Sequence, residues 1–76
     1  MNAVTLITAS AGKVDSVASK VRSIKNGVKE VLVVTGRADI AVFSKGSISD
    51  INNIILKVGK IKNVLTTETM FEVEVS

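Results

Sequence analysis

The chain has 76 residues, 46% of them hydrophobic, and ten Lys and Arg against seven Asp and Glu give it a net charge of +3. This length predicts a single domain, residues 1–76, with a small core. The absence of Cys and His excludes disulfides, zinc knuckles and every catalytic triad that contains histidine.

No run of about 18 apolar residues is available to span a bilayer. The first residues do not resemble a signal peptide, because a short apolar run interrupted by threonine precedes Lys13. We therefore expect a cytoplasmic protein with no membrane partner, whose excess apolar surface faces another protein chain. The lysines lie on or next to the two predicted helices. We favour solvated helix faces over a surface that binds nucleic acid as the reason for their positions.

Residues 3–9 predict a first strand, in which threonines interleave with branched apolar residues. A helix is predicted over residues 13–24, because its apolar residues recur every three or four positions. These positions are Val14, Val17, Ala18, Val21 and Ile24. Asn26 and Gly27, which tolerate a left-handed backbone, are expected to end this helical stretch.

Residues 30–44 predict a β-hairpin, in which the apolar runs 31–34 and 40–43 flank a polar tip, residues 35–39. Four consecutive apolar residues on each arm favour strands buried on both faces, because a half-solvated strand would alternate apolar with polar residues. The helices of this chain could cover one face. The other face then requires a partner subunit.

A second helix is expected to begin at Ser47 or Ser49, with Asp50 in its first turn. Its apolar stripe consists of Ile51, Ile54, Ile55, Val58 and Ile61. A last strand is predicted over residues 66–75. One of its faces would carry Thr67, Thr69, Phe71, Val73 and Val75, and the other Glu68, Met70, Glu72 and Glu74.

The two helical stripes are related by a constant shift of 37 residues, so that Val14 corresponds to Ile51 and Val21 to Val58. The chain is thus a β-α-β pattern written twice. This predicts an α+β, ferredoxin-like βαββαβ fold, with strands one and three central in a four-stranded antiparallel sheet and two helices on one face. Because this architecture hosts many functions, only particular residues can indicate one.

Residues 34–40, Val-Thr-Gly-Arg-Ala-Asp-Ile, resemble the V-T-G-x-[YF]-D-[LIV] hairpin of the effector-binding RAM domain in Lrp/AsnC (feast/famine) transcription regulators. Residues 24–31 and the spacing of Val64, Thr67 and Thr69 add to the resemblance, which extends over residues 3–75. Ala38 stands where the family often has an aromatic residue. The resemblance implies a stand-alone RAM module without the family's helix-turn-helix half, and hence without direct DNA binding.

The resemblance further implies a homodimer, a dimeric α+β barrel formed through the open sheet face. Such dimers would assemble into an octamer or decamer, bind a free amino-acid effector at the contacts between dimers, and join or compete with full-length Lrp/AsnC regulators.

The chemistry of the tip suits such an effector. A zwitterion needs an anion beside its ammonium and donors beside its carboxylate. Asp39 supplies the anion, and the backbone of Thr35 and Gly36 together with Arg37 supplies donors. The hydroxyls of Thr67 and Thr69 are added mainly by the resemblance. No catalytic residue, metal or cofactor is expected.

Each of these residues also has a structural explanation. Gly36 fits a positive φ in a turn, Asp39 fits a turn residue that accepts backbone N–H groups, and Arg37 fits a solvated charge. Thr67 and Thr69 are good strand formers in any sheet. For the whole chain, the alternatives are a structural oligomerisation module without a ligand site and a small ferredoxin-like dimeric enzyme. The enzyme is disfavoured because only carboxylates and lysines remain as acid-base groups.

Overall fold

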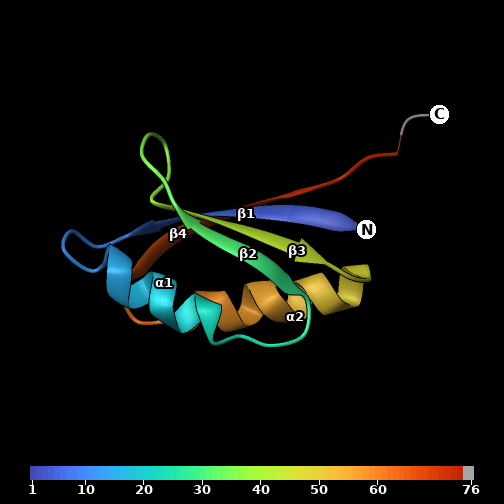
Figure 1. The fold of residues 1–76 in the computed structure, drawn as a ribbon, viewed down its shortest axis with the longest axis horizontal. Helices are drawn as coiled ribbons and strands as arrows, with labels where there is room; N and C mark the ends of the chain where they lie inside the picture. The colour runs from blue at the N-terminus through green and yellow to red at the C-terminus, as the bar shows by residue number, and fades with distance from the viewer. Residues whose placement is uncertain (75–76) are drawn as a thin grey trace.

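The computed structural model describes residues 1–74, which form four strands and two helices in the order β-α-β-β-α-β (Figure 1). These are β1 Asn2–Ala9, α1 Val14–Arg22, β2 Val28–Val33, β3 Ile40–Lys45, α2 Ile48–Gly59 and β4 Val64–Phe71. All strand pairs are antiparallel in the order β2-β3-β1-β4, and both helices cover one face of the sheet. The ferredoxin-like fold with β1 and β3 in the middle is confirmed.

The core lies between the sheet and the helices. Alternate residues of the central strands point into it, as in the pairs Thr5–Val42 and Ile7–Ile40, and each of these four side chains is at most 1% exposed. The helices contribute the positions that the periodicity indicated. The fully buried ones are Val17, Ala18, Val21, Ile51 and Val58.

The internal repeat extends to the backbone after each helix. Asn26 and Asn63, which are 37 positions apart, have φ angles of 63° and 76°. Asparagine tolerates this left-handed region better than most residues. Each asparagine turns the chain from a helix toward the next strand, which explains why the same residue type occupies both positions.

Two predicted boundaries of the first repeat need correction. α1 ends at Arg22 rather than at Ile24, because the Ser23 hydroxyl donates to the Lys20 carbonyl over 2.6 Å and closes the last turn. β2 begins at Val28, well before the apolar run, because Ser44 and Phe43 of β3 continue to pair with it. The hydrophobicity pattern alone did not predict these strand pairs, because the residues at the start of β2 are polar and lie at the edge of the sheet.

The last strand also differs from its prediction. β4 spans residues 64–71 rather than 66–75, since its partner β1 begins at Asn2 and offers nothing to pair with beyond that residue. A final hydrogen bond runs from the Glu72 N–H to the Asn2 carbonyl, over 2.8 Å. Val73 follows the strand and is 79% exposed, and Val75 lies outside the described residues. The predicted alternation does hold within β4, where Thr67, Thr69 and Phe71 share a face.

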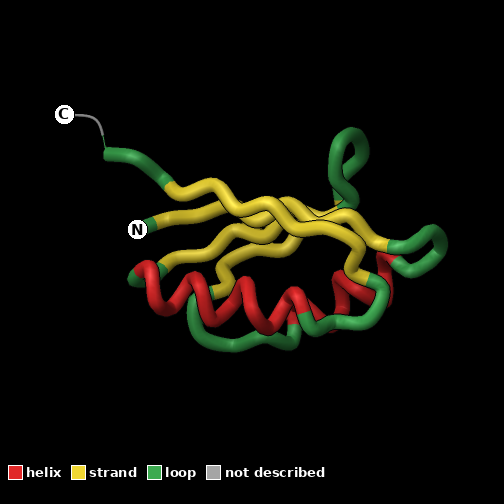
Figure 2. The backbone as a smooth tube through the Cα atoms, turned by 180° about the vertical axis from the view of Figure 1, so that it is seen from behind, coloured by secondary structure: helices red, strands yellow, loops and turns green. Residues whose placement is uncertain are grey.

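The face of the sheet away from the helices, called here the open face, is covered by no helix of residues 1–74 (Figure 2). By strand register it carries Val4, Leu6, Leu32, Ala41, Phe43 and Met70. Leu32, Phe43 and Met70 are 41%, 37% and 49% exposed. The hairpin is therefore buried on only one face within one chain. No helix in residues 1–74 is long and apolar enough to cross a membrane.

The second helix begins with a reciprocal cap. The Ser47 hydroxyl accepts from the Asp50 N–H over 3.1 Å, and the Asp50 carboxylate accepts from the Ser47 N–H over 3.0 Å. These hydrogen bonds, first that from the Ser47 backbone, hold the pKa of Asp50 below its ordinary value of 3.8. A lowered pKa means that this contribution to stability is present above about pH 4 and is lost as the pH falls through the lowered value.

We expect Ser47→Ala to reduce the free energy of unfolding by about 1 kcal/mol, because the Asp50 N–H loses its acceptor, the Ser47 hydroxyl. Ser49→Ala is the matched control, since Ser49 is exposed within the first turn and caps nothing. Urea denaturation followed by circular dichroism measures both. Equal losses in the two variants would contradict the capping role.

Candidate functional site

The loop between β2 and β3, which contains the predicted tip, stands out from the sheet on the side away from the helices (Figures 1 and 2). The Val34 N–H donates to the Asp39 carbonyl over 2.9 Å and closes the base of the loop. Thr35, Gly36 and Arg37 are exposed. Gly36 has a φ of +121°, while a Cβ placed there would meet nothing within 4 Å. Backbone conformation, and not crowding, is what favours glycine at this position.

Asp39 fastens the loop to the central strand β1. Its N–H donates to the Ile7 carbonyl, and its Oδ2 accepts from the Ala9 N–H, each over 2.9 Å. The carboxylate thus extends the β1–β3 pairing one step beyond the last backbone pair, Ile7–Ile40. Asp39 is half-buried, and within residues 1–74 its second oxygen, Oδ1, has no hydrogen-bond partner. One carboxylate oxygen therefore holds the loop to β1.

Thr67 and Thr69 lie elsewhere in the single chain. They pair with Ile7 and Thr5 across β1, which places their side chains on the helix side of the sheet. The Thr69 hydroxyl is 2.9 Å from that of Thr5, which is 1% exposed, and Thr67 is exposed at the sheet edge. The structure therefore gathers Thr35, Gly36, Arg37 and Asp39 in one loop but does not bring the two threonines to it. Ala38, beside Asp39, is buried.

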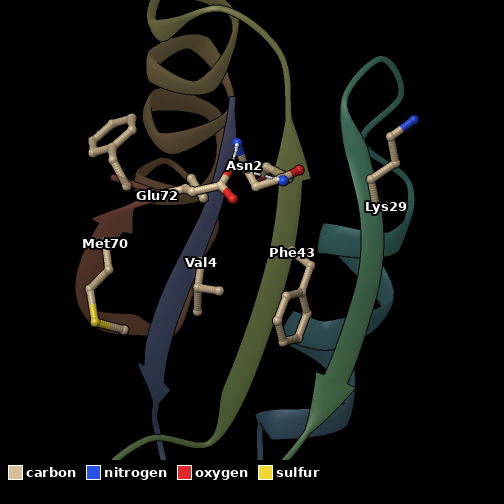
Figure 3. A pocket seen from close by; sticks show the side chains of 9 residues that line it. Asn2, Val4, Lys29, Phe43, Met70 and Glu72 are labelled. Atoms are coloured by element: carbon tan, nitrogen blue, oxygen red, sulfur yellow. Dashed lines mark hydrogen bonds between the residues drawn. The ribbon is translucent and has the colours of Figure 1, made fainter. Parts of the chain in front are cut away.

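A groove of about 350 Å³ lies at the other end of the open face, where β1 begins and β4 ends (Figure 3). The Asn2 Nδ2 and N–H donate to Glu72 Oε1 over 3.0 and 3.3 Å. Lys29 stands on the far side, and Val4 and Phe43 lie between them. The other lining residues are Ala3, Ser44, Met70 and Phe71. Sequence analysis missed this groove because the strand register alone brings these residues together.

A smaller, polar hollow of about 200 Å³ lies between the α1–β2 loop and α2, on the helix side. Its lining residues are Lys25, Asn26, Asp50, Asn53, Ile54 and Lys57. The Asp50 carboxylate already caps α2, so this hollow offers mainly exposed ammonium and amide groups. Within residues 1–74, no three acidic side chains lie close enough together to hold a metal ion.

Solved structures share this fold over nearly the whole chain. FFRP-DM1 is 30% identical, with a TM-score of 0.85 over 95% of this chain and 97% of its own. TTHA0845 from Thermus thermophilus has a TM-score of 0.89 at 19% identity, over 99% of this chain and 95% of its own.

AsnC from E. coli has a TM-score of 0.85 at 21% identity, over 97% of this chain but 51% of its own, so this chain spans about half of that protein. No protein-family model matches the sequence. No curated protein is detectably similar to it.

Two substitutions at Asp39 separate its structural role from its charge. Asp39→Ala leaves the Ala9 N–H without its partner, and we expect the free energy of unfolding to fall by about 1–3 kcal/mol. Asp39→Asn keeps an oxygen acceptor at the same place and should lose less than about 1 kcal/mol. Urea denaturation measures both values. A loss for Asp39→Asn as large as that for Asp39→Ala would show that the hydrogen bond is not what stabilises the loop.

Proposed function

The chain belongs to the Lrp/AsnC family of feast/famine regulators, and from that premise we propose that it is a non-enzymatic, oligomeric amino-acid sensor equivalent to their effector-binding RAM domain. The observation that carries the proposal is the open face, whose large apolar side chains Leu32, Phe43 and Met70 are exposed in a chain this small. Regulators of this family are not enzymes, which agrees with a sensor that works by binding alone.

Two copies pack through their open faces in the proposed dimer. Exposed Leu32, Phe43 and Met70 form the centre of the contact, with Val4 and Leu6 between them on β1. Face-to-face sheets pack about 10 Å apart with their inner side chains interdigitated. The dimer then buries the hairpin on both faces, as its two continuous apolar runs require.

The effector site of the proposal is the β2–β3 loop. This loop projects beyond the sheet (Figure 2), so it can reach a neighbouring dimer. The free oxygen of Asp39 accepts from the effector's ammonium, and the exposed backbone at Thr35 and Gly36, with the Arg37 side chain, donates to its carboxylate. Thr67 and Thr69 contribute only from an adjoining subunit, since in their own chain they lie on the other side of the sheet.

Coupling between effector and assembly follows from mass action. A ligand that binds only the contact between dimers stabilises it by RT ln(1 + [L]/Kd), which is about 2.7 kcal/mol at a hundredfold excess over Kd. That amount shifts the balance from dimers to an octamer or decamer. The larger assembly can then join or compete with full-length regulators, without direct contact with DNA.

We expect Phe43→Glu to raise the Kd of the dimer by at least about a hundredfold, because a charge would have to be buried at the centre of the contact. Phe43 is already 37% exposed in the single chain, so the fold itself should survive. Leu56→Glu is the matched control, since Leu56 is 63% exposed on α2, on the far side of the sheet. Sedimentation over a range of protein concentrations measures both, and an unchanged Kd for Phe43→Glu would remove the open face from the interface.

A calorimetric screen of the twenty amino acids tests the effector site. We expect at least one of them to bind, and its affinity to fall by at least about tenfold in Asp39→Asn, which keeps the hydrogen bond to Ala9 but lacks the charge. Asp15→Asn is the matched control, because it removes one carboxylate from exposed α1, on the helix side of the sheet. If no amino acid binds the wild-type assembly, the alternative of a structural oligomerisation module replaces the sensor.

A further inference from the structure

The polar hollow on the helix side has two walls, which are the loop from α1 to β2 and one face of α2 (Figure 1). Lys25 and Asn26 line it from the loop, and Asn53, Ile54 and Lys57 line it from the helix. All of these except Ile54 are exposed. The hollow and the open face lie on opposite sides of the sheet, so the proposed dimer leaves the hollow accessible.

Gly27 holds the loop close to α2. A Cβ at this position would lie 3.0 Å from Ile54 Cδ1 and 3.2 Å from the Lys45 carbonyl oxygen, and its φ of +112° also favours glycine. The Lys45 N–H donates to the Gly27 carbonyl over 2.9 Å, which ties the loop to β3. The wall that carries Lys25 and Asn26 is therefore fixed in place by the residue that follows it.

Hydrogen-bond donors dominate the hollow. The ammonium groups of Lys25 and Lys57 only donate, and the amides of Asn26 and Asn53 each add an NH₂ group. Within residues 1–74, no group accepts from the backbone N–H of Lys25 or of Asn26. An occupant that is rich in acceptor oxygens therefore fits this set of side chains.

The carboxylate of Asp50, which also lines the hollow, is set apart from the cationic end. Its Oδ2 accepts from the Ser47 N–H over 3.0 Å at the start of α2. Lys57 follows Asp50 by two turns of α2, which is about 10 Å along the helix axis. The hollow thus keeps a cationic end at Lys57, where an anion would not face the carboxylate directly.

The charge of the whole helix layer has the same sign as this end of the hollow. Residues 13–25 and 47–62, which contain both helices, hold seven Lys and Arg and two Asp, a net charge of +5, whereas the rest of the chain has a net charge of −2. A surface with such an excess of one sign raises the local concentration of ions of the other sign. Anions are therefore attracted to the side of the molecule where the hollow lies.

We infer that the hollow binds a phosphate group, either as inorganic phosphate or on a small phosphorylated molecule. A phosphate monoester carries about −1.5 to −2 charges at pH 7 and three strong acceptor oxygens, so it can accept from both walls at once. The volume of about 200 Å³ is below the range of about 300–1,000 Å³ for pockets that enclose drug-sized ligands. This size favours a small ligand. The site depends on neither the proposed dimer nor the proposed effector.

The ³¹P resonance of inorganic phosphate, titrated with the protein at fixed pH and ionic strength, measures the binding. We expect saturable broadening with the wild type. Lys25→Gln and Lys57→Gln should each raise the Kd by at least about threefold, and the double variant by at least about tenfold, because charge-assisted donors are lost. Both lysines are exposed, so the variants should fold.

The internal repeat supplies matched controls for this titration. Lys62 and Lys20 stand 37 positions from Lys25 and Lys57, and neither lines the hollow. Lys62→Gln and Lys20→Gln should keep the Kd within about twofold of the wild type, because salt screens distant exposed charges. Equal weakening in all four variants would show only a general attraction to the basic layer. That result, or no saturable binding by the wild type, would overturn the site.

Phosphoethanolamine and acetate complete the test. If phosphoethanolamine binds more tightly than inorganic phosphate, the site takes a phosphorylated molecule, and the reverse order identifies free phosphate. Either order supports a phosphate site. Acetate carries one charge and two oxygens, so it should displace phosphate poorly at equal concentration. Equal displacement by acetate would contradict the assignment to phosphate.

Discussion

The structure depends on one constraint, which is that the two central strands are apolar on both faces while the chain has helices for only one. The buried side of β1 and β3 is sealed by α1 and α2, and residues such as Ile7 and Ile40 have no exposed surface. Burial of apolar surface contributes about 25 cal/mol per Å². Burial of the uncovered side, with Phe43 near its centre, would give a similar gain in free energy. One chain alone cannot obtain this gain. The proposed dimer rests on this imbalance and requires no ligand.

Local pattern was enough to predict the elements and their order. The helix stripes depend on spacing of three and four residues, which a single segment contains in full, and the 37-residue repeat supplied the topology. Strand ends could not be predicted in this way, because a strand continues only as far as its neighbour does. The alternation through Val73 is as regular as that of β4, yet β1 begins at Asn2 and the ladder stops there.

The same distinction between local sequence pattern and strand pairing applies to the candidate site. The cluster from Thr35 to Asp39 is contiguous in sequence, so composition was sufficient to find it. Whether Thr67 can contribute to that cluster depends on which face of the sheet its side chain occupies. The register places it on the helix side. The two explanations for Asp39 turn out to be compatible, because one carboxylate oxygen accepts from Ala9 while the other has no partner within residues 1–74. The groove was beyond sequence analysis, since nothing local connects Lys29 with Glu72.

The β2–β3 loop and the groove lie far apart on the sheet. The groove lies where β1 begins, whereas the β2–β3 loop projects at the opposite end (Figure 1). In the proposed assembly, a ligand that joins one dimer to the next would therefore lie far from the groove. Since a ligand shifts an equilibrium only by its difference in affinity between two states, an effector at the proposed loop site would change how many dimers assemble. The proposed dimer, held by the apolar open face, would then be the same unit in every assembly.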